Sequence, residues 1–163
     1  MKNKTNDNLM LDAHDIKLLA ALQRDAKVTH QAMGEQVYLS TSQVSRRVQR
    51  LEQAGLIQRY VALLDPDVAN LGVRAITDVT LTRHGDEGQT FEQAILDIDE
   101  VLDCYAVAGE ADYVLQIVVP TLQDLSDKVF KQLMRIDGVA NIRSNIVLAR
   151  IKSTTALPLA HMA

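Results

Sequence analysis

The spacing of apolar residues changes at Asp65-Pro66-Asp67, and this change constrains the fold more than any other feature. Before this turn-forming triplet, apolar residues recur at intervals of three and four, the spacing of amphipathic helices. After it, apolar runs of strand length alternate with segments of helical spacing. The sequence therefore predicts an α+β protein in which a helical module is joined to a mixed module by a linker at residues 65–72.

The first module is predicted to hold three short helices, each with its own start signal. Asp12 can cap the first helix and Thr29 the second. The third helix begins with a capping box of the S-x-x-Q type, formed by Ser40 and Gln43, and Gly55 is a suitable stop. Two helices joined by a short turn, the second with a well-defined start, are typical of a helix-turn-helix unit.

The third predicted helix has two different sides. Val44, Val48 and Leu51 share one side and are expected to be buried. At 100° per residue the opposite side is polar and basic, and it carries Ser42, Arg46, Gln49, Arg50 and Gln53. The residues that follow, 56–64, alternate imperfectly and are predicted to form a strand beside the helices.

The second module predicts the order β-α-β-β-α-β, the ferredoxin-like arrangement. Gly109-Glu110-Ala111-Asp112 is expected to join the two middle strands as a hairpin. The helical stripes are Phe91, Ala94, Ile95 and Ile98 in the first helix, and Leu125, Val129 and Leu133 in the second. The four strands are expected at residues 73–82, 101–108, 113–119 and 139–152.

The two modules carry opposite charge. Residues 1–64 hold nine Lys and Arg against six Asp and Glu, whereas residues 65–163 hold eight against fifteen, so their net charges are +3 and -7. The overall charge of -4 therefore hides a basic first module. Such asymmetry indicates that one part of the chain meets a polyanion.

The third helix is the predicted DNA-reading element, because the major groove of double-stranded DNA admits one helix and arginine can bind guanine through two hydrogen bonds. The alternative is that these arginines are only solvated surface residues. Residues expected to meet base edges lie near the helix start or on its outer side: Ser42, Gln43, Ser45, Arg46 and Gln49. Residues expected to meet phosphates lie on the flanks and on the strand that follows: Arg47, Arg50 and Arg59.

These segments resemble the Lrp/AsnC family of transcription regulators along residues 11–159. The resemblance implies a winged helix-turn-helix domain at 1–64, a linker at 65–72, and a βαββαβ domain at 73–163 that binds an effector and oligomerises. It implies a homodimer that assembles into an octamer or another multiple of dimers. Tyr38, Thr41 and Gln43 depart from the residues common in the family, which are Gly in the turn and Pro near the start of the reading helix.

The resemblance also implies an amino-acid site, because Gly109-Glu110-Ala111-Asp112-Tyr113 is similar to the family's G-[DE]-x-D-Y hairpin. Asp112 is expected to pair with the ammonium group of the effector, and backbone N–H groups from Ala108 to Ala111 with its carboxylate. Asn145, Ile146 and Val147 align with the strand that lines the family pocket, so an apolar effector such as Leu or Met is favoured. The alternative is that the segment is only a hairpin turn.

Other functions find little support in the sequence. His14, His30, His84 and His161 are scattered and have no metal-like spacing with Cys104, and neither a catalytic set nor a phosphate loop is evident. We therefore expect no enzyme activity, no metal and no cofactor beyond the amino-acid effector. Cys104 is expected to be a small buried strand residue.

The location and the role expected of the protein follow from the same features. Without an apolar run long enough for a membrane span or a secretory signal, a cytoplasmic, nucleoid-associated protein is expected. The leading hypothesis is a sequence-specific, effector-responsive transcription regulator. The alternative is an architectural DNA-organising protein that wraps DNA mainly through phosphate contacts and depends little on an effector.

Overall fold

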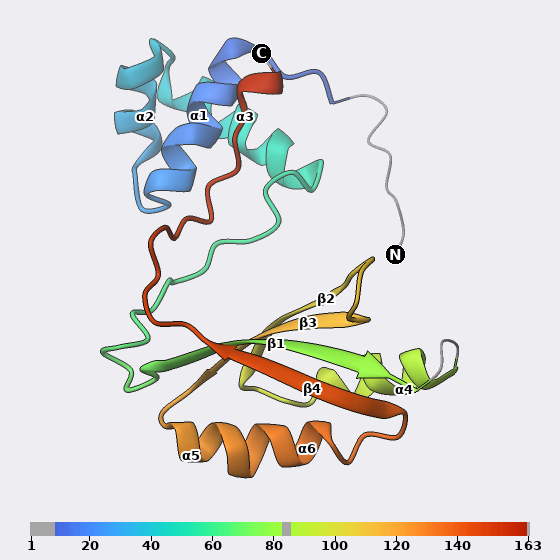
Figure 1. The fold of residues 1–163 in the computed structure, drawn as a ribbon. Helices are drawn as coiled ribbons and strands as arrows, with labels where there is room; N and C mark the ends of the chain where they lie inside the picture. Colours follow the sequence, from blue (N-terminus) through green and yellow to red (C-terminus); the bar gives the residue numbers. More distant parts are fainter. Residues whose placement is uncertain (1–8, 83–85, 163) are drawn as a thin grey trace. The chain divides into compact units, whose positions relative to one another are not determined.

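A computed structural model describes residues 9–82 and 86–162, which divide into two compact units (Figure 1). The first unit contains residues 9–62 together with residues 152–162, and the second contains the described part of 63–151. The sequence had placed residues 152–163 with the second module. In the structure the described part of this tail makes its contacts with the helical unit instead.

The helical unit is built from α1 (Ala13–Arg24), α2 (His30–Val37) and α3 (Thr41–Gln53). Each predicted cap is present. The side chain of Asp12 accepts hydrogen bonds from the first turn of α1, and Thr29 accepts one from Ala32. Ser40 and Gln43 form a reciprocal capping box at the start of α3. These local hydrogen bonds explain why the helices begin where the sequence predicts.

The core of the helical unit lies between the three helices and contains Leu18, Met33, Val37, Val44 and Val48. Gly34 allows the close approach that the turn between α2 and α3 requires. A Cβ atom at this position would lie 2.4 Å from the carbonyl oxygen of Leu39. Any larger residue would therefore push α3 away from α2.

Residues 56–64 do not form the predicted strand. They run as an extended segment after α3, and no strand pairs with them among the described residues. The prediction was wrong because an alternating sequence forms a strand only when a neighbouring backbone satisfies its N–H and C=O groups. Several apolar side chains of this segment are exposed, including Val61, Leu63 and Leu64.

The tail ends in a short 3-10 helix, Ala160–Met162, and is held to α1 by the side chain of Gln23. The N–H of Leu157 donates to Gln23 Oε1 at 2.6 Å, and Gln23 Nε2 donates to the Leu157 carbonyl at 3.3 Å. One amide side chain thus satisfies both backbone groups of a tail residue.

The second unit has the predicted βαββαβ order. Its strands are β1 (Val73–Leu81), β2 (Val101–Ala106), β3 (Tyr113–Val119) and β4 (Val139–Ile146). They form one antiparallel sheet in the order β2-β3-β1-β4, so that β1 and β3 are central. β4 is shorter than predicted, because the last residue it pairs with β1 is Ile146.

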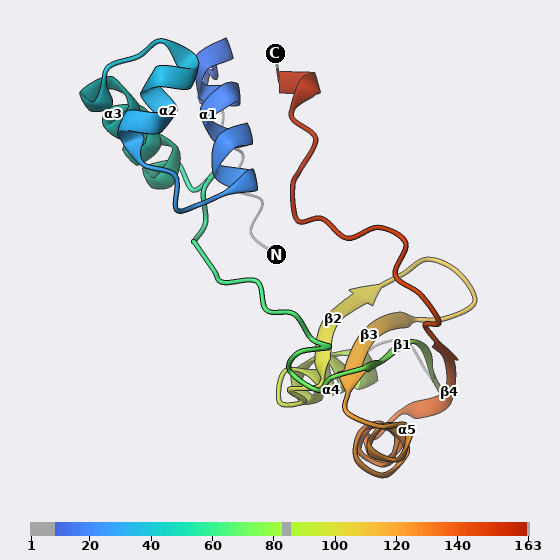
Figure 2. The ribbon, with the colours of Figure 1, turned by 90° about the vertical axis from the view of Figure 1, so that its left-hand side faces the viewer.

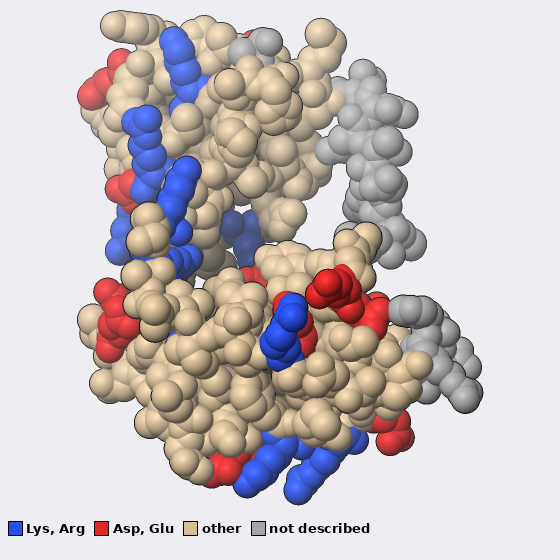
Figure 3. Space-filling view, in the orientation of Figure 1, with Lys and Arg blue, Asp and Glu red and all other residues tan. Residues whose placement is uncertain are grey.

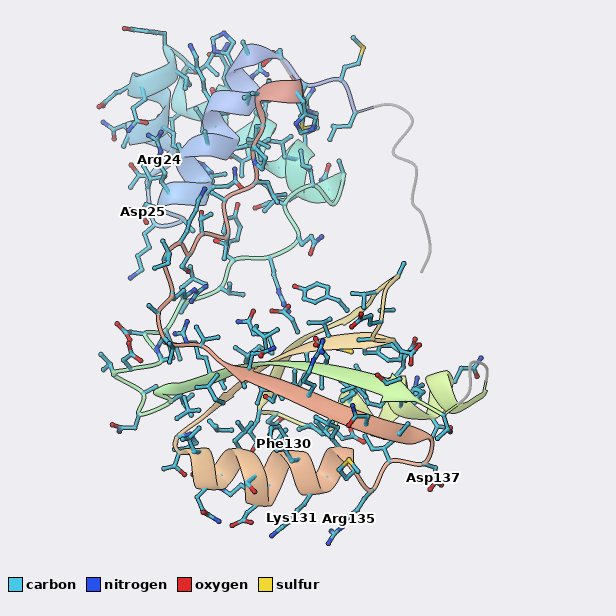
Figure 4. The ribbon with its side chains drawn as sticks, viewed as in Figure 1. Arg24, Asp25, Phe130, Lys131, Arg135 and Asp137 are labelled. Carbon is cyan, nitrogen blue, oxygen red and sulfur yellow. The ribbon has the colours of Figure 1, made fainter. Side chains whose placement is uncertain are left out.

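Helices cover one face of this sheet (Figure 2). They are α4 (Asp86–Ile95) and a continuous helical segment made of α5 (Leu122–Asp124), a π-helical turn (Leu125–Phe130) and α6 (Lys131–Leu133). In Figure 4, Phe130 points towards the sheet whereas Lys131 and Arg135 point away from it. The predicted helical stripes thus form the core between helices and sheet, with Phe91, Val129 and Leu133 fully buried.

The expectation for Cys104 was wrong, because this residue is exposed on β2. β2 is an edge strand that bonds only to β3, and all its residues after Val101 are exposed. An apolar run of strand length therefore gave the correct element but not its burial. No helix in the described part of the chain is long and apolar enough to cross a bilayer.

Candidate DNA-binding and effector sites

The outer side of α3 is polar and exposed, and the opposite side of the same helix is apolar and buried. Val44, Val48 and Leu51 fix this orientation, since each is almost fully buried against the other helices. Arg46 lies at the centre of the exposed side and forms no ion pair with any acid among the described residues. In Figure 3, Lys and Arg side chains gather along one side of the helical unit. The exposed residues of α3 include Ser42, Ser45, Arg46, Gln49, Arg50 and Gln53.

On one flank of α3, two arginines form ion pairs with acidic residues at the start of α1. Arg47 Nη1 lies 2.8 Å from Asp15 Oδ1 and 2.7 Å from Asp12 Oδ2. Arg50 Nη2 lies 2.5 Å from Asp15 Oδ2. The backbone N–H of Asp15, together with Arg47, lowers the pKa of Asp12 to about 2, and the hydrogen bond to Asp15 raises the pKa of Arg47. Two of the three arginines predicted to meet phosphates, Arg47 and Arg50, are thus engaged within the protein.

The other flank of α3 borders a hollow of about 490 Å³ in the helical unit. Ser45 and Gln49 line it together with apolar residues of α1 and α2. Tyr60 closes one side, since its hydroxyl donates to Glu52 Oε1 at 2.9 Å. Burial and this carboxylate raise the pKa of Tyr60 to about 12. This bond ties the extended segment 56–64 to α3.

Of the residues predicted to contact DNA, Gln43 has an additional role, and Arg59 lies outside any strand. Gln43 Oε1 accepts hydrogen bonds from the backbone N–H of Ser40 and from its hydroxyl, so its oxygen serves the capping box. Its amide nitrogen is the group left to meet DNA. Arg59 is exposed on the extended segment rather than on a strand. The chemistry available to this surface is donation from guanidinium, amide and hydroxyl groups, which suits base edges and phosphates.

The predicted effector hairpin connects β2 and β3. Ala108, Gly109 and Glu110 are exposed, Ala111 and Asp112 are half-buried, and Tyr113 is buried. Asp112 Oδ2 accepts a hydrogen bond from the backbone N–H of Leu81 at 2.7 Å, and its own N–H donates to Val79 at 3.0 Å. Asp112 therefore holds the hairpin against the end of β1.

Asp112 and Tyr113 also line a hollow of about 240 Å³ beside α4. Gly88, Gln89 and Glu92 of α4 contribute its other wall, with Leu81 and Ala106 of the sheet. Tyr113 donates to Glu92 Oε1 at 3.0 Å, and burial together with this carboxylate raises the pKa of Tyr113 to about 12. Two carboxylates, Asp112 and Glu92, thus border one small cavity that a cation such as an ammonium group fits.

Asn145, Ile146 and Val147 lie elsewhere in the unit. Asn145 pairs with Ile76, and the N–H of Val147 bonds to Arg74, near the start of β1. Asp112 bonds to Leu81 at the end of β1. Leu81 lies five residues after Ile76, which corresponds to about 17 Å along an antiparallel strand. Val147 lines a separate hollow of about 420 Å³ with Asp65, Gly72 and Arg74, among others. Within one chain Asp112 thus lies apart from residues 145–147, whereas Glu110 of the hairpin reaches Arg143 of β4 at 4.0 Å.

Two residues of these sites were not predicted from the sequence. Asp15 lies in the first turn of α1 and binds two arginines of α3. Glu92 gave no separate signal, but its position four residues after Gly88 places both on one side of α4. Among residues 9–82 and 86–162, no group of three His, Cys, Asp or Glu side chains is arranged to hold a metal ion.

The fold and its two sites define a class of protein in which a helix-turn-helix unit is followed by a ferredoxin-like ligand-binding unit. Two family models match accordingly: winged helix-turn-helix DNA-binding at residues 11–58, and the Lrp/AsnC ligand binding domain at residues 74–157. The chain belongs to the Lrp/AsnC family of transcription regulators.

Similar proteins match over almost the whole chain. The leucine-responsive regulatory protein of Haemophilus influenzae is 34% identical over 97% of this chain and 96% of its own. The DNA-binding transcriptional activator DecR of Escherichia coli is 36% identical over 92% of this chain and 99% of its own. A transcriptional regulator from Neisseria meningitidis, solved as its L-Met complex, is 38% identical with a TM-score of 0.91, covering 94% of this chain and 99% of its own.

Proposed function

We propose that this protein is a sequence-specific transcription regulator that reads double-stranded DNA with α3 and responds to an amino acid. The outer side of α3 carries the proposal, because a capped helix of 13 residues presents Ser42, Arg46 and Gln49 on its exposed side. A helix of this kind fits the major groove, where Arg46 can bind guanine. Arg59, exposed on the segment after α3, is proposed to meet a phosphate.

The proposed effector is a small apolar amino acid such as Leu or Met. Asp112 and Glu92 provide negative charge for its ammonium group, and the exposed hairpin at 108–111 offers backbone N–H groups for its carboxylate. Ile146 and Val147 would surround an apolar side chain. The names of the relatives support this choice, since one is called leucine-responsive and another is solved with L-Met.

The effector is proposed to bind where copies of the chain meet. Asp112 and residues 145–147 lie near opposite ends of β1, so a ligand that touches both is proposed to take them from two copies. This geometry favours a homodimer that assembles further, to an octamer or another multiple of dimers. The amino acid would then act by stabilising one assembly over another.

The test begins with a duplex selected from random sequences by the wild-type protein. Its affinity is compared with that of random DNA at fixed salt, with and without Leu or Met. We expect Arg46→Ala to weaken the selected site by roughly 1–3 kcal/mol and to relax the preference at one base position. Arg24→Ala, which removes an equal charge from an exposed position on α1, is the matched control.

Two results would contradict the proposal. Equal affinity of the wild-type protein for selected and random DNA would favour the architectural alternative, since only a sequence reader needs a large ratio. A thermal-shift screen of the twenty amino acids in which none raises the unfolding temperature would remove the effector from the proposal.

A further inference from the structure

Asp15 is a charged residue with no solvent exposure, placed in the first turn of α1. Its Oδ1 accepts a hydrogen bond from Arg47 at 2.8 Å, and its Oδ2 accepts one from Arg50 at 2.5 Å. The backbone N–H of Asp12 also donates to Oδ2, at 3.1 Å, as part of the α1 capping box. The cap of α1 and two arginines of α3 therefore form one network.

A buried carboxylate is stable only when its charge is paired and its oxygens accept hydrogen bonds. Here both partners come from α3, three residues apart and hence on the same side of that helix. Arg47 is additionally paired with Asp12. Rotation of α3 about its own axis would break these contacts and leave Asp15 buried without a partner.

We propose that Asp15 is a positioning residue for DNA recognition, and that Arg47 and Arg50 serve this network rather than supply phosphate contacts. Val44, Val48 and Leu51 hold α3 against the core, but apolar packing is not directional. The two ion pairs fix the rotation of α3, and with it the direction in which Ser42, Arg46 and Gln49 point. The inference rests on the proposed reading of DNA by α3.

The competing role for Arg50 is a direct phosphate contact, since half of its side chain remains exposed, at 47%. The two roles differ in salt dependence. A phosphate contact releases a counterion, so its loss makes the dependence of log affinity on log salt shallower by about one unit. Loss of a positioning residue lowers the preference for the selected site and leaves this slope unchanged.

The experiment measures the affinity of the full-length protein for the selected duplex and for random DNA over a series of salt concentrations. We expect Asp15→Asn to lower the ratio of the two affinities by roughly 5- to 150-fold, the effect of one mismatched base pair, without a shallower slope. Arg50→Ala should lower the ratio in the same way. Arg59→Ala, at an exposed arginine with no acid partner among the described residues, should make the slope shallower by about one unit.

Arg50→Lys keeps the experiment decisive if Asp15→Asn fails to fold. Lysine retains the positive charge, but its shorter side chain does not reach the Nη2 position that meets Asp15 Oδ2. A positioning role therefore predicts a lower ratio, and a phosphate role predicts wild-type binding. The inference is overturned if Arg50→Ala makes the slope as shallow as Arg59→Ala does, or if Asp15→Asn folds and keeps the wild-type ratio. Absence of any binding by the wild-type protein would instead contradict the proposed function.

Discussion

The two units of this chain carry buried or half-buried carboxylates that serve their sites in different ways. In the helical unit, Asp15 is fully buried and binds side chains of the proposed reading helix. In the sheet unit, Asp112 is half-buried, binds the backbone of β1 and borders a cavity. Asp15 thus supports the proposed reading surface of a single chain. Asp112 is proposed to belong to an effector site whose second segment pairs with β1 about 17 Å further along that strand.

This difference indicates how the two proposed activities depend on assembly. The exposed side of α3 in a single helical unit presents the donors proposed to contact one DNA half-site. The proposed effector site is expected to need a second copy of the sheet unit, because residues 145–147 pair near the opposite end of β1 from Asp112. We therefore expect DNA binding to persist in variants that have lost the effector response.

The largest expected effect comes from emptying the core of the sheet unit. Phe91 is fully buried and its ring centre lies 4.6 Å from that of Tyr113. Phe91→Ala should destabilise this unit by about 3–5 kcal/mol, because a large cavity replaces the ring. Hydrogen exchange should accelerate at the amides of β1 and β3 and stay unchanged in α1 and α3.

Leu18→Ala is the matched variant in the core of the helical unit, where Leu18 is also fully buried. It should destabilise by about 2–5 kcal/mol and give the opposite exchange pattern. If each variant accelerates exchange in both units, the two cores unfold together. That result would contradict the independence of the two units.

A smaller effect is expected from Asp112→Asn, which keeps the shape of the side chain and an oxygen to accept from Leu81. The change removes the charge proposed to bind the effector ammonium. Titration calorimetry with Leu and Met should show a loss of about 1.5–3 kcal/mol in affinity, the typical strength of a hydrogen bond to a charged group. Affinity for the selected DNA without effector should stay at the wild-type value.

Asp137→Asn removes an equal charge from an exposed position of the same unit and should leave the titration unchanged. Wild-type effector affinity in Asp112→Asn, combined with a lower unfolding temperature, would limit Asp112 to holding the hairpin against β1. That result would make the two carboxylates alike, since both would then be structural.

How far the sequence predicts each unit depends on the range of the interactions involved. The start of α3 was predicted correctly because the Ser40–Gln43 capping box is a contact between residues three apart. The network of Asp15 was missed because it joins residues 32 and 35 positions apart. The strand predicted at 56–64 failed for the same reason, since its alternation is local but its pairing partner is not.

The sheet unit repeats this lesson at the candidate effector site. The order of elements along the chain was predicted correctly as βαββαβ, and the connection between β2 and β3 contains Gly109 and Asp112 as expected. The exposure of Cys104 and the cavity wall formed by Glu92 depend on which strand lies at the edge and on how α4 packs. Both properties depend on tertiary packing, which the periodicity of the sequence does not predict.

A gain of stability is expected at the turn between α2 and α3. Tyr38 adopts φ 60° and ψ 43°, the left-handed conformation that glycine tolerates best, and its side chain is 93% exposed. Tyr38→Gly should therefore stabilise the helical unit by about 1 kcal/mol, measured by denaturant unfolding. Tyr38→Ala keeps a Cβ atom at the same backbone angles and should give no gain. Destabilisation by Tyr38→Gly would show that the tyrosine ring makes a stabilising contact.

The smallest effect is expected at Asp12, where the network around Asp15 reaches the surface. Its pKa is lowered from 3.8 to about 2, so the ionised carboxylate stabilises the folded unit. This contribution is fully present above pH 3.8 and is lost as the pH falls through about 2. Because the side chain is 50% exposed, solvent screening keeps the contribution below about 1 kcal/mol.

Asp12→Asn tests this contribution, since asparagine still caps a helix but carries no charge. At neutral pH the variant should unfold at a slightly lower temperature than the wild-type protein, as followed by the helical circular dichroism signal. The difference should shrink between pH 3.8 and about 2 and then vanish. Arg47→Gln should reduce this pH-dependent difference without removing it, because the backbone N–H groups of Asp15 and His14 also lower the pKa of Asp12. If the difference in unfolding temperature stays constant down to pH 2, the effect of Asp12→Asn comes from capping alone. The charge of Asp12 would then contribute nothing through the ion pairs with α3.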